Sequence, residues 1–372
     1  LRPALDSHPP RARLPLKSEG RRRFHDYQDL MHYRIMDILL VSTPYDTFIL
    51  EEAGELAERM LGEFRNLDLH YAPALTGVTS GAEALRIARE RGINLIITTP
   101  HLPDMDASEL ARLVQDEGLD IPVVLLAWDT RELREFEARV DTSAIERTFL
   151  WQGDARILVA IVKSVEDRRN VEHDTNAVGV QVILLIEDNV RYYSSFLPVI
   201  YTELLQHSRR VVKEGLNLSQ QIMRMRARPK ILLCTTWEEA EANFDRYADD
   251  VLGIISDVQF PREGMKSPQA GADFAKEVGA AYPDIPIILH SSRPENETLA
   301  ESVDANFLLK GSPLLLQELR KVMLQDFAFG DFIFKDAKGR MLTVATDLRS
   351  LEEKLASVPQ ESIIRHAGRN HF

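Results

Sequence analysis

Short apolar runs alternate along most of the chain with longer stretches whose apolar residues have helical spacing. In the second half, these runs cover residues 182–186, 251–255, 287–289 and 307–309. Their length and polar flanks favour strands buried on both faces. Because strands and helices alternate, the pattern predicts a parallel, doubly wound α/β sheet.

The first half of the chain repeats this plan. Segments 37–41, 96–103, 122–127 and 149–153 align with the four runs of the second half and their flanks, and a helix is expected over 80–91. The repeat predicts two flavodoxin-like α/β domains in tandem, each with a five-stranded parallel sheet.

The segments outside these domains have different patterns. Residues 1–35 are rich in Pro and Arg and predict a basic tail with a short helix over 24–35. The polar stretch 166–178 indicates a linker. The expected boundaries are 1–35 for the tail, 36–168 for the first domain, 169–179 for the linker, 180–325 for the second domain and 326–372 for a short α+β extension.

The extension has hairpin and helix signals. Residues 331–344 predict a hairpin with a turn at 336–339. A helix over 348–356, capped by Asp347, and a second helix from about Pro359 are expected to follow.

Charge and cysteine content exclude some classes of protein. A net charge of −13 over 372 residues argues against nonspecific nucleic-acid binding by the whole chain. Residues 1–35 carry eight Lys/Arg and four Asp/Glu, which suits a solvated leader or a nucleic-acid arm. No apolar run approaches the roughly 20 residues that span a bilayer. The one cysteine, Cys234, permits no intrachain disulfide, so a buried thiol and a cytoplasmic location are expected.

Five chemically active residues follow the strands of the second domain. Glu187 and Asp188, then Asp257, Ser291 and Lys310, stand at or just beyond the ends of the apolar runs. The carboxyl ends of parallel strands meet at one edge, so these side chains are expected to converge in one crevice.

The converging carboxylates indicate a magnesium site. Hard oxygen ligands on short loops suit Mg²⁺, which takes one or two carboxylates and keeps several waters. Asp188, Asp257 and the main-chain carbonyl of Gln259 are the expected ligands, with Glu187 in the outer shell. An aspartate beside such a metal can attack a phosphoryl group, which makes Asp257 the expected nucleophile.

These residues and their local spacing resemble the receiver domain of two-component response regulators. Ile183-Leu-Leu-Ile-Glu-Asp-Asn189 resembles the family's first strand and acidic pair, and Ile254-Ile-Ser-Asp-Val-Gln-Phe-Pro261 its phosphoacceptor strand. Pro286-Ile-Ile-Leu-His-Ser291 and Phe307-Leu-Leu-Lys310 resemble its fourth and fifth strands.

The resemblance implies a role for each residue. Asp257 would be the phosphoacceptor, Lys310 and Ser291 would contact the phosphoryl group, and Ser291 with Phe307 would form the switch. It also implies Mg²⁺, a histidine kinase or phosphotransfer protein as donor, and a downstream output domain or protein as target.

The first domain resembles a receiver that has lost this chemistry. Its residues at the corresponding positions are Ser42, Thr43, Thr99, Ala127 and Gln152. Without carboxylates there is no metal site, so this pseudo-receiver is expected neither to bind Mg²⁺ nor to accept phosphate. It is interpreted as either a spacer or a partner-docking unit.

The second domain departs from its family in three places. Gly311 replaces the usual proline after the lysine, so a trans peptide is expected there. Segment 262–271 is longer than usual and is interpreted as a surface insertion or as a lid or partner loop. Segment 197–228, with a break near 215–217, is an extended or doubled helix. Its basic residues form a dimer or partner surface or a solvated face: Arg209, Arg210, Lys213, Arg224, Arg226 and Arg228.

Two other hypotheses about function stay open. Both halves could serve as a phosphorylation-independent scaffold for partner proteins. A phosphohydrolase of the haloacid-dehalogenase kind would need a second aspartate where Gln259 stands. Loop 260–271 and the carboxyl segment also resemble regulatory regions ahead of phosphoenolpyruvate-synthase-like domains, which implies an output domain beyond residue 372.

Overall fold

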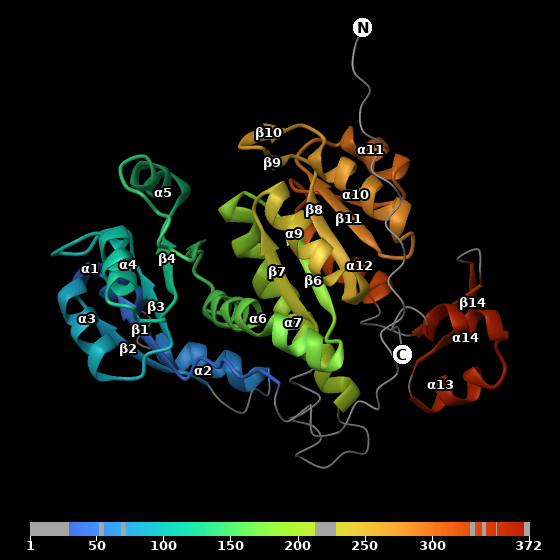
Figure 1. Ribbon diagram of the computed structural model, residues 1–372, viewed down its shortest axis with the longest axis horizontal. Coiled ribbons are helices and arrows are strands. Elements are labelled where there is room, and N and C mark those ends of the chain that lie inside the picture. Colours follow the sequence, from blue (N-terminus) through green and yellow to red (C-terminus); the bar gives the residue numbers. More distant parts are fainter. Residues whose placement is uncertain are drawn as a thin grey trace, which may run out of the picture.

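The computed structural model contains two five-stranded sheets side by side, with a small hairpin and two helices at one end (Figure 1). All strand pairs in both large sheets are parallel. This confirms the predicted fold class. The structure describes residues 30–51, 56–67, 72–212, 228–327, 332–336, 340–346 and 348–367.

The first sheet has the strand order β2-β1-β3-β4-β5. Its strands are β1 Asp37–Val41, β2 Ala74–Val78, β3 Leu95–Thr98, β4 Val123–Ala127 and β5 Arg147–Leu150. The three central strands, β1, β3 and β4, are almost wholly buried, as expected for a sheet covered on both faces.

The second sheet has the equivalent order, β12-β11-β8-β6-β7. Its strands are β6 Val182–Ile186, β7 Lys230–Cys234, β8 Val251–Asp257, β11 Ile287–Ser291 and β12 Asn306–Leu309. The order reverses beside β6, so the carboxyl ends of β6 and β8 flank the switch point at which doubly wound sheets bind ligands.

Helices cover both faces of each sheet. The first sheet is accompanied by α1 Pro44–Glu51, α2 Leu56–Asn66, α3 Gly81–Glu90, α4 Ala107–Asp116, α5 Thr130–Glu137 and α6 Arg156–Val178. The second is accompanied by α7 Val190–Val212, α9 Trp237–Tyr247, α10 Ala270–Ala281, α11 Asn296–Ser302 and α12 Leu315–Asp326. None of the helices in the described residues has the length and apolar content needed to cross a membrane.

The two sheets share one hydrophobic core. A single buried cluster joins Leu40 and Phe149 of the first sheet to residues of α6, such as Ile161, and to Phe196 of α7 and Ile183 of the second sheet. Separate clusters fill the opposite faces, under α3 and α4 in the first sheet and under α9 and α10 in the second. The halves are therefore joined by packing as well as by the chain.

The expected linker over 169–179 is wrong, because residues 169–178 belong to the continuous helix α6 and Gly179 is its C-cap. Four of the polar side chains that suggested a linker are buried and paired: Glu166, Asp167, Asn170 and Asp174. Asp167 binds the Arg228 guanidinium at 2.7 Å and also accepts hydrogen bonds from Tyr201 Oη and Ile231 N. Asp174 pairs with the buried Lys230 at 2.8 Å. These polar residues attach α6 to the second sheet.

The expected helix over 24–35 is also wrong where the structure describes it, since residues 30–36 are not helical. The N–H groups of Met31, Tyr33 and Ile35 donate to side chains of α6 at Asp174, Asn170 and Glu166. Alternate residues of an extended chain are about 6 Å apart along the chain, and so are residues four positions apart in a helix. The alternate N–H groups of this segment therefore match side chains spaced four residues apart on α6. Residues 24–29 lie outside the described part.

The extended helix after the acidic pair is present as α7, which reaches Val212. The side chains of Arg209 and Arg210, the break near 215–217, Lys213, Arg224 and Arg226 lie outside the described residues. Arg228 is described and is not on a solvated face, because its guanidinium is buried against Asp167.

The carboxyl segment contains the expected hairpin, formed by β13 Phe332–Lys335 and β14 Met341–Ala345, which is shown in red in Figure 1. Helices α13 Leu348–Leu355 and α14 Gln360–Ala367 follow as expected. His366 of α14 is buried and accepts a hydrogen bond from Lys335 N. Residues 337–339 of the turn and the expected cap Asp347 are outside the described part.

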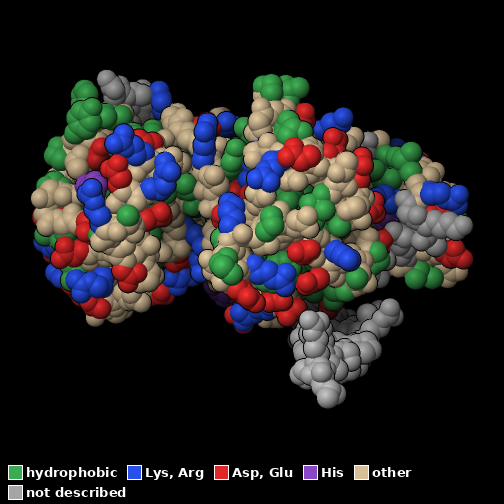
Figure 2. All heavy atoms as spheres, turned by 90° about the horizontal axis from the view of Figure 1, so that it is seen from above, with side chains coloured by type: hydrophobic (Ala, Val, Ile, Leu, Met, Phe, Trp, Pro, Cys, Tyr) green, Lys and Arg blue, Asp and Glu red, His purple; other side chains and the backbone are tan. Residues whose placement is uncertain are grey.

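Figure 2 shows a face on which basic and acidic side chains are interspersed over the described residues. A continuous basic field, which would attract nucleic acid, does not cover this face.

Candidate functional site

The carboxyl ends of four parallel strands position the five predicted residues. Glu187 and Asp188 follow β6, Asp257 ends β8, Ser291 ends β11 and Lys310 follows β12. The register brings His290 opposite Asp257 and Leu309 opposite Ser291, so these strands end at the same edge.

Lys310 joins two of the acidic residues. Its Nζ lies 2.7 Å from Asp257 Oδ2 and 2.7 Å from Glu187 Oε2, and all three side chains are almost completely buried. The ring of Tyr192, in the first turn of α7, lies beneath the ammonium, 4.3 Å from Nζ to the ring centroid. The lysine is therefore held in place by two carboxylates and an aromatic ring.

Burial and mutual contact shift the pKa values of Glu187, Asp257 and Lys310. Burial raises the pKa of Glu187 to about 8, against the opposing charge of Lys310. It also raises the pKa of Asp257, again opposed by Lys310. Burial acts to lower the pKa of Lys310, but the two carboxylates outweigh it and the pKa is raised. A cation bound beside these carboxyl groups would favour their ionised forms and so lower both raised pKa values.

The donor set fits a hard divalent cation. One carboxylate oxygen from each of Glu187, Asp188 and Asp257 lies within 4.8 Å of the others. Asp188 Oδ1 is buried and has no hydrogen-bond partner among the described residues, an arrangement that leaves one acceptor for a metal. Gln259 N donates to Asp257 Oδ1 at 3.2 Å, which brings the Gln259 backbone to the same carboxylate. The role of the Gln259 carbonyl stays a prediction.

Ser291 is buried beside the cluster but is held by its own loop. Its Oγ accepts hydrogen bonds from Asn296 Nδ2 at 2.8 Å and from Arg293 N at 3.2 Å. Phe307, the other predicted switch residue, is half-buried in β12 and packs against the core under α9 and α10. The peptide before Gly311 is trans, as expected.

Two residues of this site carried no recognisable sequence signal. His290 is fully buried with Nδ1 3.5 Å from Glu187 Oε2, and burial lowers its pKa well below the ordinary value. Gly271, the second residue of α10, lies so close to the end of β8 that an added Cβ would be 2.1 Å from Asp257 O. Both positions are defined by tertiary contacts that a single sequence does not reveal.

Hydroxyl side chains occupy the positions in the first α/β unit that correspond to the acidic residues of the second unit. Ser42 Oγ lies 2.7 Å from Thr47 Oγ1, and Thr43 Oγ1 donates to Asp46 Oδ2 at 2.8 Å. The other Asp46 oxygen accepts from the indole Nε1 of Trp128. Thr99 is buried with its Oγ1 3.4 Å from Asp46 Oδ2. The lone carboxylate of this cluster is thus satisfied by neutral donors.

Gln152, which stands at the lysine position of the first sheet, contacts the second half instead. Its Nε2 donates to Arg191 O at 3.2 Å, and its Oε1 accepts from Ser195 Oγ at 3.0 Å. Tyr193 Oη donates to Thr148 O at 2.6 Å and Ser194 Oγ accepts from Leu150 N at 3.0 Å. The first turns of α7, which begin just after the acidic pair, therefore cover the edge strand β5.

The predicted insertion over 262–271 begins in a strand pair, formed by β9 Phe260–Arg262 and β10 Met265–Ser267. Lys266 of β10 reaches the acidic cluster, with Nζ 2.9 Å from Asp188 Oδ2. The sequence placed this segment beside the site but did not identify the lysine.

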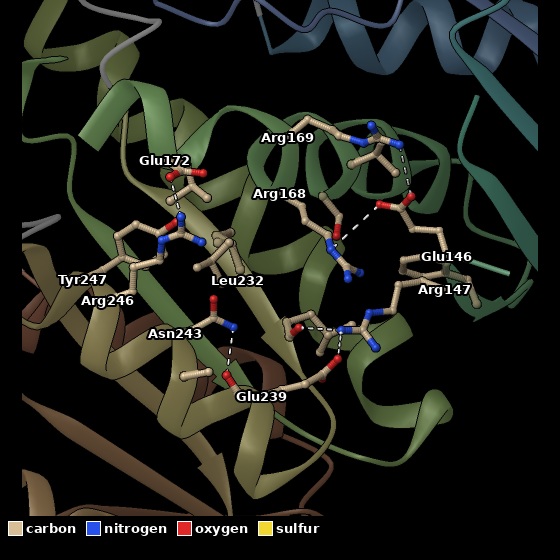
Figure 3. A pocket seen from close by; sticks show the side chains of 17 residues that line it. Glu146, Arg147, Arg168, Arg169, Glu172, Leu232, Glu239, Asn243, Arg246 and Tyr247 are labelled. Atoms are coloured by element: carbon tan, nitrogen blue, oxygen red, sulfur yellow. Dashed lines mark hydrogen bonds and ion pairs between the residues drawn. The ribbon is translucent and has the colours of Figure 1, made fainter. Parts of the chain in front are cut away.

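A cavity of about 340 Å³ lies away from the cluster, between β5, α6, β7 and α9 (Figure 3). Its basic side chains are mostly paired with acids. Arg147 lies 2.7 Å from Glu239, and Arg246 binds Glu172. These pairs identify the cavity as part of the contact between the two halves.

Comparison with known proteins gives distant likeness only. The chain is similar to the signal receiver domain of an HD domain-containing protein from Pseudomonas fluorescens Pf-5, at 21% identity and a TM-score of 0.27, over 38% of this chain and 94% of that one. It is also similar to two structures described as response regulator/GGDEF domain proteins of two-component systems. Each of these has 15% identity, a TM-score of 0.32 and coverage of 78% of this chain and 99% of theirs.

No protein-family model matches the chain, and no curated protein matches it significantly. The interpretation of the site therefore rests on the residues of the chain itself.

Proposed function

We propose that the second α/β unit is the phosphoacceptor module of a two-component phosphorelay and that the first is its pseudo-receiver. The observation that carries this proposal is Lys310 Nζ, buried and 2.7 Å from both Asp257 and Glu187. An ammonium fixed beside a strand-end aspartate is placed to neutralise the oxygens of an incoming phosphoryl group.

Asp257 is the nucleophile in this proposal. A carboxylate oxygen attacks the phosphorus of a phosphohistidine, so an O–P bond forms, the P–N bond breaks and the electron pair leaves with the imidazole. Lys310 and the Gln259 N–H favour the ionised form of Asp257, against the effect of burial. Mg²⁺ bound by Asp188, Asp257 and the Gln259 carbonyl, with Glu187 in the outer shell, would supply further neutralisation of the transferred charge.

The Ser291 hydroxyl provides the switch. In this structure it accepts hydrogen bonds from Asn296 and Arg293. After phosphorylation it would turn to donate to a phosphoryl oxygen, and Phe307 would follow inward. A contact that exists only in the phosphorylated form shifts the conformational equilibrium and the contacts with a downstream domain or protein.

Intact-protein mass spectrometry after treatment with acetyl phosphate and Mg²⁺ tests the proposal. The native chain is expected to gain one phosphoryl group, and Asp257→Asn to gain none. If both gain the group, Asp257 is not the acceptor. If neither gains it while both remain folded, the scaffold function becomes the better explanation.

A further inference from the structure

The β9–β10 ribbon is a tight hairpin with a fixed position. Met265 pairs with Arg262, Lys266 with Pro261 and Ser267 with Phe260. The two residues of its turn, Glu263 and Gly264, have φ of 54° and 75°. Two successive positive φ values are the signature of the type I′ turn, whose twist matches that of the paired strands.

Helix α9 holds the ribbon beside the acidic cluster. The ring of Phe260 is buried and stacks on Trp237, and the Arg262 guanidinium lies 3.7 Å from the centroid of the same indole. Glu263 N donates to Glu238 Oε1 at 2.6 Å. Figure 1 shows the ribbon at the upper edge of the second sheet, above α9. Contacts with Trp237 and Glu238, the first two residues of α9, therefore anchor the hairpin that carries Lys266.

The ribbon supplies a cation to the metal-binding carboxylate. Lys266 Nζ lies 2.9 Å from Asp188 Oδ2, while Asp188 Oδ1 has no hydrogen-bond partner among the described residues. The Lys266 side chain is 54% exposed and that of Asp188 is 19% exposed. The ammonium can leave for solvent at little cost, whereas the carboxylate cannot follow it.

We infer that Lys266 is a tethered counter-cation of Asp188, which Mg²⁺ must displace, so that the β9–β10 ribbon sets the metal affinity of the site. The inference rests on the proposed metal site and adds to it a residue that competes for one ligand. Lys266 keeps its proton throughout and turns from Asp188 into solvent as the metal binds. In the metal-bound state the nearby ammonium still repels Mg²⁺.

Calorimetric titration of the full chain with Mg²⁺ tests this inference. Lys266→Met keeps a long, unbranched side chain but removes both the competing charge and the repulsion. We expect its Mg²⁺ affinity to rise roughly threefold to tenfold, the range set by one partly exposed ion pair and one charge–charge repulsion. Lys321→Met is the matched control, because it removes the same charge from an exposed position on α12 and is expected to leave the affinity unchanged.

Asp188→Asn separates the two hypotheses. It is expected to abolish Mg²⁺ binding. If the native chain binds Mg²⁺, Asp188→Asn does not, and Lys266→Met has unchanged or lower affinity, the metal site stands and the role of Lys266 is overturned. If neither the native chain nor Lys266→Met binds Mg²⁺ at millimolar concentration, the metal site and the competing lysine are both wrong.

Discussion

At the residue scale, the site depends on close packing around Asp257 by side chains and by the backbone of α10. Lys310, Glu187 and Asp257 are in direct contact, and the backbone of Gly271 passes the carbonyl of Asp257 without room for a side chain. Position 271 therefore requires glycine for a reason of space, not of backbone conformation.

Gly271→Ala tests that requirement. Its Cβ would meet the Asp257 backbone at 2.1 Å, so α10 or the end of β8 must move. Overpacking of this kind costs about 1–3 kcal/mol, and we expect a loss of that size in urea denaturation. Gly279→Ala, on the same helix with open space at the Cβ position, is expected to be neutral or stabilising. Equal stability of both variants would contradict the close approach.

The residue types and their order were sufficient to predict most of the site. Glu187, Asp257 and Lys310 could be predicted to meet because each ends or directly follows a recognisable strand. Lys266 and Tyr192 could not, because a hairpin in an insertion and the rotation of α7 decide what these side chains touch. The neutral state of His290 likewise depends on burial, which its strand position alone does not establish.

At the scale of elements, α7 connects the two halves to the site. Its first turns contact β5 of the first sheet, and Tyr192 in the same turns lies beneath Lys310. A change at the β5 contact is thus transmitted to Tyr192, which contacts Lys310. This arrangement favours docking, rather than simple spacing, as the role of the first α/β unit.

Tyr193→Phe tests the α7 contact. It removes the hydrogen bond to Thr148 O and leaves that carbonyl without this donor, which costs about 1–3 kcal/mol when the group is buried. We expect this loss in urea denaturation, together with weaker Mg²⁺ binding if α7 positions the acidic loop. The control is Tyr282→Phe, whose hydroxyl makes no hydrogen bond among the described residues. Equal effects of the two variants would argue against the contact.

Element types could be predicted better than element contacts. The central strands of both sheets follow directly from their apolar runs. Helix α6 was misread as a linker because Glu166, Asp167, Asn170 and Asp174 look solvent-exposed in sequence, whereas distant partners bury and pair them. Partners far along the chain carry no local signal, so polar residues in a helix could not be distinguished from a polar connection.

At the scale of the whole molecule, two copies of one fold share a core and differ in chemistry. The second sheet ends in carboxylates and a lysine, and the first ends in hydroxyls around Asp46. The core cluster and α6 span both halves. The chemistry of the two halves therefore has to be compared in the intact chain.

The most direct measurement treats the intact chain with acetyl phosphate and Mg²⁺, reduces it with borohydride and maps the peptides by mass spectrometry. Reduction converts an aspartyl phosphate to homoserine, which marks the acceptor. We predict homoserine at position 257 and an unmodified peptide around Thr99. Modification at another aspartate, or phosphate retained on Thr99, would contradict the division of the molecule into an active receiver and an inert partner.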